Sequence, residues 1–196
     1  MRVFGYISEQ ESRHSGSGTP FLPGYNFHER HESGPIFAPA DAILDAVAAY
    51  DMRSDPLSHA FMTLRELPGK LFPSTKTSRE PQPAFGLHTF TPLERGPDTL
   101  SYGLTGRFWR TDMGIIPLRD VGEFTAFQQP GVARLVLHFQ LVAEGEAWRL
   151  RTETFIGCPD KATRLKLLPY WLLIRTASGM IRRRTLSAIR HQLSGR

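Results

Sequence analysis

A chain of 196 residues with 40% apolar and 22% charged residues has the composition of a folded domain, which excludes a fibrous or largely disordered protein. The single cysteine, Cys158, excludes an internal disulfide and a metal site made of several cysteines, and it is typical of a reducing compartment. No stretch approaches the roughly 20 apolar residues that a membrane-spanning helix needs, and the N-terminal residues lack the apolar core of a secretory signal. We therefore expect a soluble, cytoplasmic protein.

The net charge of +5 is unevenly distributed along the chain. Residues 160–196 hold nine lysines and arginines and one acidic residue, a net charge of +8, so the other residues together carry −3. The basic character therefore belongs to one C-terminal segment and not to the whole surface.

The first third of the chain predicts a leader, a strand and two helices. We expect residues 1–24 to form a flexible leader and residues 25–196 to form a single domain. Alternation over 25–37 predicts a strand. Residues 38–51 predict a helix, because Pro39 suits a first turn and the apolar residues form one stripe, namely Ile43, Leu44, Val47 and Tyr50. A second helix is predicted over 55–69, with Asp55 as its N-cap.

Beyond a Pro- and Ser-rich loop at 73–84, the apolar residues recur with a period of two. We predict strands at 99–110, 132–142 and 148–156, with shorter strands at 85–91 and 114–118. A helix of one to two turns is predicted after Asp120, which is spaced from Glu123 as a capping box.

The long predicted strands each have one apolar face. The residues assigned to it are Leu100, Tyr102, Leu104, Phe108, Ala133, Leu135, Leu137, Phe139, Leu141, Trp148, Leu150, Thr152, Thr154 and Ile156. Such alternation predicts an antiparallel sheet covered on one face only. The cover would be a C-terminal helix with the stripe Leu167, Trp171, Ile174, Ile181 and Ile189, kinked or broken at Pro169 or at 177–179.

The order of these elements resembles the helix-grip fold of the START-like superfamily, which is also called SRPBCC or polyketide cyclase-like. The segment "IFAPADAILDAV" is similar to that superfamily's strand-into-helix opening. The closing segment "TETFIGCPDKATRLKLLPYWLLIRTASGMIRRRTLSAIR" is similar to the end of a bacterial family of unknown function near that group. The resemblance covers about 25–193 and implies an α+β protein whose curved antiparallel sheet wraps around a long C-terminal helix. It also implies a cavity for an apolar or amphipathic small molecule.

The stretch "HERHE" at 28–32 suggests a zinc site, but its spacing does not fit one. Histidines of an HExxH motif are four residues apart on one helix face, whereas His28 and His31 are three apart. On a strand that spacing places them on opposite faces. We therefore expect no metal site, and no sequence motif indicates a cofactor.

Glu29 and His31 are the candidate catalytic residues. They share a strand face with Tyr25 and Phe27, so they would be buried if these aromatic side chains point inward. A buried Glu–His pair could carry out proton transfer. The alternative, which we prefer at this stage, is that this edge of the sheet is solvated and the pair is an ordinary surface pair.

The candidate ligand-binding residues lie on the apolar face of the sheet and on the C-terminal helix: Trp171, Thr152, Thr154, Leu150, Ile174 and Tyr102. Hydroxyl groups on an apolar wall can orient a ligand, although threonine is also simply a good strand former. The small residues at 177–179 indicate either a close approach of the helix backbone or a cavity, and we predict the cavity. Cys158 is expected to be a buried or incidental thiol.

The sequence thus predicts a protein that binds a hydrophobic or amphipathic small molecule between the sheet and the C-terminal helix. One alternative is a cyclase- or hydrolase-like enzyme that uses Glu29 and His31. Another is a peripheral membrane or protein-docking module that uses the basic C-terminal end. Arg182, Arg183 and Arg184 are consecutive and spread around a helix, so we do not expect a nucleic-acid surface.

Overall fold

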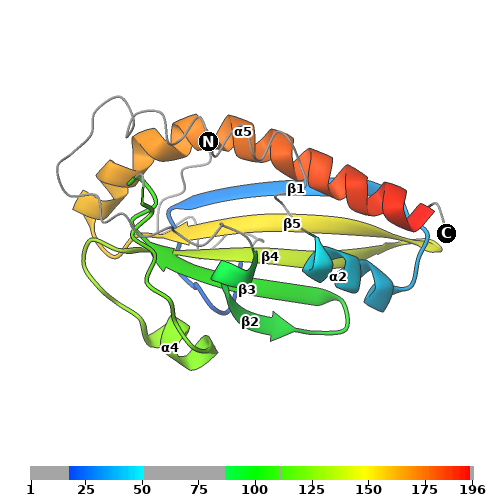
Figure 1. Cartoon of the computed structure of the whole chain (residues 1–196), viewed down its shortest axis with the longest axis horizontal. Helices are drawn as coiled ribbons and strands as arrows, with labels where there is room; N and C mark the ends of the chain where they lie inside the picture. Colours follow the sequence, from blue (N-terminus) through cyan, green and yellow to red (C-terminus); the bar gives the residue numbers. More distant parts are fainter. Residues whose placement is uncertain (1–17, 51–86, 111, 195–196) are drawn as a thin grey trace.

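The protein is α+β, with helices packed on a five-stranded antiparallel sheet (Figure 1). The computed structural model describes residues 18–50, 87–110 and 112–194. The strand order in the sheet is β1-β5-β4-β3-β2. Its elements are β1 (Phe27–Ile36), α2 (Ala40–Ala49), the 3-10 turn η2 (Leu87–Thr89), β2 (Thr91–Arg95), β3 (Thr99–Gly106), α4 (Val121–Ala126), β4 (Ala133–Glu144), β5 (Ala147–Gly157) and α5 (Lys161–Ser194).

The long strands lie where the alternation predicts them, except that the strand predicted over 99–110 ends at Gly106, and the two short strands do not lie where predicted. In place of a strand at 85–91, η2 is followed by β2. Residues 114–118 form no strand, although Ile116 N donates a hydrogen bond to Thr105 O beside β3. The second predicted helix at 55–69 and the loop at 73–84 lie outside the described residues.

One face of the sheet, here called the helix-side face, carries the predicted apolar positions. Hydrogen-bonded pairing aligns three rows of residues across four strands: Phe27, Ile156, Leu135 and Leu104; Glu29, Thr154, Leu137 and Tyr102; and His31, Thr152, Phe139 and Leu100. Of the β4 residues, Leu137, Phe139 and Leu141 are buried and Leu135 is partly buried, so the predicted phase of this strand is confirmed.

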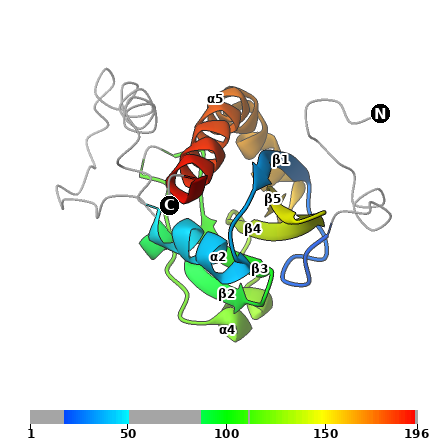
Figure 2. The ribbon, with the colours of Figure 1, turned by 90° about the vertical axis from the view of Figure 1, so that its right-hand side faces the viewer.

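Two helices cover the helix-side face, and Figure 2 shows α2 and α5 on the same side of the sheet. They contribute to the main core the buried residues Ile43, Leu44, Val47, Leu167, Trp171, Leu186 and Ile189. The predicted helix stripes are thus confirmed at these positions except Leu186, which is buried but was not part of the predicted stripe. The side chains of Ile174 and Ile181 lie outside the described part of the chain.

The other face of the sheet, here called the outer face, is not bare, so the prediction of a sheet covered on one face only is wrong. A second apolar cluster lies there: Leu22, Tyr25, Leu93, Phe124, Val136 and Phe155. Tyr25 was predicted on the face of Phe27, but it precedes β1 and packs edge-on against Phe155 with 5.0 Å between ring centroids. Leu22, from the segment predicted as a leader, is fully buried in this cluster.

Helix α5 is a single helix of 34 residues, about 50 Å long at 1.5 Å per residue. The Asp160 side chain accepts hydrogen bonds from Thr163 N, at 2.7 Å, and from Gly131 N, at 3.0 Å. These bonds begin the helix and lower the pKa of Asp160 to about 2. The helix continues through Pro169 and through 177–179, where the sequence predicted a kink or a break, so the described helix has no break at either position. Figure 1 shows a bend in the orange N-terminal part of α5.

Gly103 gives a test of the packing on the outer face. A Cβ added there would lie 2.7 Å from two ring carbons of the fully buried Phe124. Because the ring is enclosed, we expect Gly103→Ala to lower the free energy of unfolding by about 1–3 kcal/mol.

The measurement is urea unfolding, with Gly24→Ala as the matched control. No atom lies within 4 Å of a Cβ at Gly24, so that variant should change stability by less than about 1 kcal/mol. Equal stability of the two variants would contradict the packing around Phe124.

Candidate functional site

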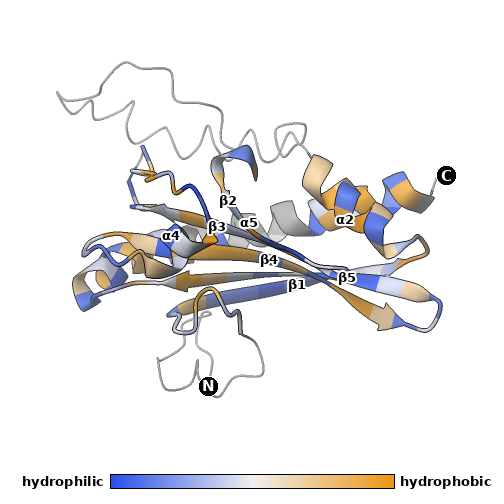
Figure 3. Cartoon of the chain, turned by 90° about the horizontal axis from the view of Figure 1, so that it is seen from below, coloured by the Kyte–Doolittle hydropathy of each residue, from blue (hydrophilic) through white to orange (hydrophobic). Residues whose placement is uncertain are grey.

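Helix α5 lies along β1, the edge strand of the sheet, and the two segments run in the same direction. Trp171 packs on Phe27 with 5.5 Å between ring centroids. Two turns later, Gly179 reaches Glu29 and His31, which follow Phe27 on the same face of β1. Figure 3 shows β1 coloured almost entirely as hydrophilic, in contrast to the mostly hydrophobic β4. The helix therefore covers a strand whose inward side chains are partly charged.

Beneath α5 the buried Glu29 and the partly buried His31 form a pair. His31 Nε2 lies 3.1 Å from Glu29 Oε1, and the exposed fractions of the two side chains are 16% and 8%. The preferred interpretation from the sequence, an ordinary surface pair, is therefore wrong. An edge strand is normally solvated, but here the helix backbone at Gly179 replaces the solvent.

Three polar atoms in this region lack a hydrogen bond within the described structure: Glu29 Oε2, His31 Nε2 and Thr154 Oγ1. The nitrogen of His31 is close enough to Glu29 for an ion pair, but the two groups are not aligned as a hydrogen bond. Thr154 lies directly opposite Glu29 on β5 and is 3% exposed. Two incompletely bonded side chains thus lie on the same face of adjacent strands.

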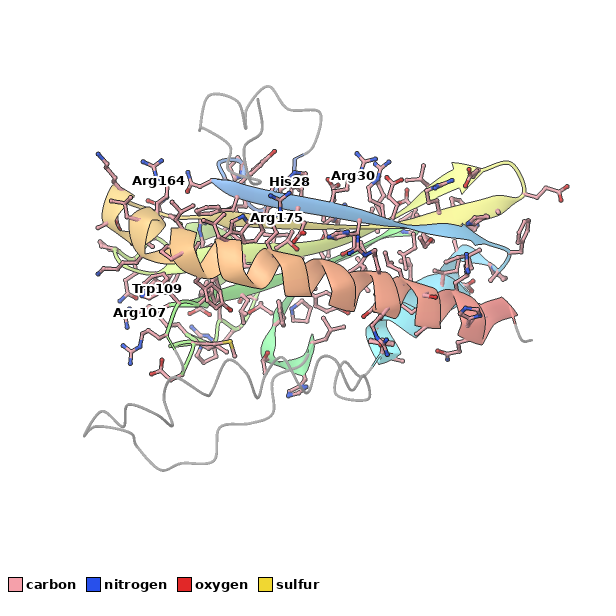
Figure 4. All side chains as sticks on the ribbon, turned by 90° about the horizontal axis from the view of Figure 1, so that it is seen from above. His28, Arg30, Arg107, Trp109, Arg164 and Arg175 are labelled. Atoms are coloured by element: carbon pink, nitrogen blue, oxygen red, sulfur yellow. The ribbon has the colours of Figure 1, made fainter. Side chains whose placement is uncertain are left out.

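Arg175 supplies a positive charge at the rim of this group. Its Nε lies 3.9 Å from Glu29 Oε1, and its side chain is 37% exposed. Figure 4 shows Arg175 on the side of α5 nearest β1. Arg175, His31 and Gly179 all approach the same carboxylate oxygen, Oε1. The other oxygen, Oε2, has no such neighbour among the contacts of the described residues.

The predicted ligand-binding residues lie around this group. Thr152 and Thr154 occupy the helix-side face in the rows of His31 and Glu29, and Leu150 is fully buried on the same strand. Tyr102 lies in the row of Glu29 and Thr154, two strands further, and burial raises the pKa of its phenol. The side chain of Ile174 is outside the described part of the chain.

The small residues at 177–179 allow a close approach of the helix backbone. A Cβ on Gly179 would lie 3.2 Å from His31 Cε1 and 3.4 Å from Glu29 Oε1. At Gly179, therefore, contact with the β1 side chains takes the place of the cavity predicted from these small residues.

A second polar group crosses the outer face. Ser101, His138, Glu153 and Arg30 occupy opposed positions on four neighbouring strands. Ser101 Oγ and His138 Nδ1 are 2.8 Å apart, and His28 Nε2 lies 2.9 Å from Glu153 Oε1. The prediction that His28 and His31 lie on opposite faces of the strand is confirmed. The row itself was not predicted, because alternation alone does not give the register between strands.

This outer row has the residue types of a Ser-His-acid triad, but its burial argues against nucleophilic catalysis. Ser101 is 0% exposed, so a substrate could not reach its hydroxyl. The buried His28–Glu153 pair instead connects β1 to the sheet. Over the described residues, no three His, Cys, Asp or Glu side chains gather into a set that could hold a metal ion.

Burial raises the pKa of the Glu153 carboxyl. The hydrogen bond and charge of His28, together with Arg30 and His138, lower this pKa by more than burial raises it, so that it lies below the ordinary value of 4.5. Burial lowers the pKa of His138. Burial also raises the pKa of the Cys158 thiol to about 12, which keeps it protonated and a poor nucleophile.

The basic C-terminal end is solvent-facing at Arg183 and Arg184. The side chain of Arg182 lies outside the described residues. Within the part of the chain that the structure describes, no helix combines the length and the apolar composition needed to cross a membrane. Docking of this end on a surface stays a prediction.

No protein-family model matches the chain, and no curated protein sequence matches it.

Glu153 gives a pH-dependent test of the outer row. A carboxyl whose pKa is lowered by folding stabilises the folded state above its unfolded pKa, and this contribution is lost as the pH falls through the folded value. We expect Glu153→Gln to lower the free energy of unfolding by about 1–3 kcal/mol at pH 7. The deficit should shrink as the pH falls below 4.5, the ordinary value for this group.

Urea unfolding at pH 7 and near pH 3.5 measures both effects. Glu146→Gln, at an exposed position in the β4–β5 turn, is the matched control and should change little. A deficit that is the same at both pH values would show that Glu153 does not stabilise the protein through its charge.

Proposed function

We propose that this protein binds a small amphipathic molecule between α5 and the helix-side face of the sheet. The observation that carries the proposal is the pair of buried atoms without hydrogen bonds, Glu29 Oε2 and Thr154 Oγ1, on neighbouring strands. Buried polar atoms are almost always bonded in folded proteins, because leaving one unbonded costs about 1–3 kcal/mol. A ligand that supplies the missing bonds removes this cost.

The surroundings support a ligand with an apolar body. Leu137, Leu150 and Phe139 lie on the same face as the polar pair, and Trp171 lies on the adjoining turn of α5. Ligand sites characteristically combine an apolar wall with a few polar groups that fix orientation. The predicted residues Trp171, Thr152, Thr154, Leu150 and Tyr102 fit this description, with Glu29 and His31 at the polar end.

The same arrangement agrees with the resemblance to START-like proteins. A long C-terminal helix against an antiparallel sheet, preceded by a strand and a short helix, is the order that the helix-grip fold implies. We propose the helix-grip fold on this ground. The proposal of binding rests on the unbonded atoms and not on fold likeness, because one fold serves many functions.

The test fills the proposed space beside Thr154. N-phenyl-1-naphthylamine, a neutral probe whose fluorescence rises in apolar surroundings, should bind the wild-type protein. Thr154→Leu removes the unbonded hydroxyl and adds bulk. We expect this variant to keep or gain thermal stability while its affinity for the probe falls at least about tenfold.

Thr152→Leu is the matched control, because Thr152 is the next residue on the same face of β5 and is also buried. Thr152 has a partner in the structure, so its replacement should lower stability by about 1–3 kcal/mol. Loss of stability in Thr154→Leu with unchanged probe binding would show a filled core at Thr154 and contradict the proposal.

A second candidate function is proton transfer to or from the bound molecule. It is favoured by the 3.1 Å separation of His31 Nε2 and Glu29 Oε1 in a buried position. A base next to a carbonyl-bearing ligand could remove a proton from the carbon beside the carbonyl.

The test is deuterium exchange of 2-decanone, an amphipathic ketone, in heavy water, followed by mass spectrometry. Protein should accelerate exchange beside the carbonyl, and His31→Gln should abolish most of the acceleration. Acceleration that survives both His31→Gln and Glu29→Gln would exclude this pair as the base.

A further inference from the structure

The two oxygens of Glu29 have different surroundings, and this difference restricts the chemistry of the ligand. Oε1 lies 3.1 Å from His31 Nε2 and 3.9 Å from Arg175 Nε. It is also the oxygen that the backbone of Gly179 approaches. Oε2 is buried without a hydrogen bond in the described structure. A ligand that reaches Glu29 would therefore contact Oε2.

A carboxylate oxygen accepts hydrogen bonds and cannot donate them. A ligand at Oε2 must therefore bring a hydrogen atom on nitrogen or oxygen. A ligand carboxylate brings none at neutral pH, and it would place a second negative charge beside a buried one. The site thus disfavours a fatty acid in spite of the nearby arginine.

The existing charges also decide between a neutral and a cationic donor. Arg175 already lies within ion-pair distance of Glu29, and His31 lies at hydrogen-bond distance. A cationic ligand would add a further positive charge to a carboxylate that already has a guanidinium partner, and it would lose its own hydration. A neutral group has neither disadvantage.

The unbonded hydroxyl of Thr154 further restricts the hydrogen bonds that the ligand must make. Its hydroxyl is 3% exposed, lacks a hydrogen bond in the described structure and lies directly opposite Glu29. A hydroxyl can donate and accept at the same time. One ligand hydroxyl could therefore donate to Glu29 Oε2 and accept from Thr154 Oγ1, which would satisfy both atoms.

We infer that the ligand is an uncharged molecule whose polar end is a hydroxyl group, held between Glu29 Oε2 and Thr154 Oγ1, with its apolar body along the helix-side face. This inference rests on the proposed binding function and narrows it to one class of ligand. Glu29 selects against carboxylates, and Thr154 completes the pair of bonds.

The experiment compares three probes that share one chain, dodecan-1-ol, dodecanoate and dodecylammonium. Dodecanoate and dodecylammonium are titrated below their micelle concentrations and dodecan-1-ol below its solubility limit, at pH 7.5, against protein carrying N-phenyl-1-naphthylamine. We expect dodecan-1-ol to displace the fluorescent probe at least about tenfold more effectively than dodecanoate or dodecylammonium.

Glu29→Gln tests the origin of this preference. The amide can donate to a carboxylate, so the preference for dodecan-1-ol over dodecanoate should fall about tenfold or more. Glu146→Gln, which removes an exposed carboxylate, should keep the wild-type preference. Thermal melts of both variants establish that they are folded. If Glu29→Gln is unstable, Glu29→Asp replaces it; this variant keeps the charge on a shorter side chain and should retain selection against dodecanoate.

The outcomes separate the two proposals. If N-phenyl-1-naphthylamine itself does not bind, the proposed function fails and the inference falls with it. If it binds, but dodecanoate or dodecylammonium displaces it as well as dodecan-1-ol does, the binding function stands and the hydroxyl inference is overturned. Failure of dodecan-1-ol to displace a bound probe, or an unchanged preference in Glu29→Gln, also overturns the inference.

Discussion

The contact between the backbone of α5 and the carboxylate of Glu29 constrains the rest of this structure. Glu29 lies on an edge strand, where backbone and side chains would ordinarily meet water, and α5 takes the place of that water. A buried charge is tolerated only with compensating charges and hydrogen bonds. The position of α5 provides Arg175 at one side, and Gly179 lets the backbone come within contact distance of the pair. The path of the helix and the charge on β1 therefore depend on each other.

On the outer face, too, β1 buries a polar side chain that has a partner on a neighbouring element. Because side chains alternate along β1, His28 faces the outer side while Glu29 and His31 face the helix. His28 pairs with Glu153 and also stacks on Phe155 with 4.8 Å between ring centroids. On the outer face the His28–Glu153 pair thus joins β1 to β5 in addition to the backbone pairing of the two strands, and on the helix-side face Glu29 lies 3.9 Å from Arg175 of α5. This accounts for a strand that is hydrophilic along most of its length although half of its residues are buried.

The alternation of apolar residues was sufficient to predict the phase of the long strands, because only one phase buries Leu137 and Phe139. It could not predict register, and so it missed the row from Ser101 to Glu153. Tyr25 was assigned to the wrong face because β1 begins only at Phe27, and the alternation of side chains does not extend to residues before the strand. Glu29 and His31 were assigned to the surface because charged residues on edge strands usually lie there. The deciding contact comes from Gly179, about 150 residues away in the sequence.

The balance between stability and function gives the last argument for a ligand. Val in place of Thr154 would have nearly the same shape and a better strand propensity, and it would bury no unbonded hydroxyl. Glu29 Oε2 is unfavourable in the same way. A fold optimised for stability alone would retain neither atom, whereas the outer row shows that this sheet can satisfy buried polar groups, since His28 and Glu153 bond to each other. Unbonded atoms on one face and bonded ones on the other are expected if only the helix-side face is completed by a molecule from outside the chain.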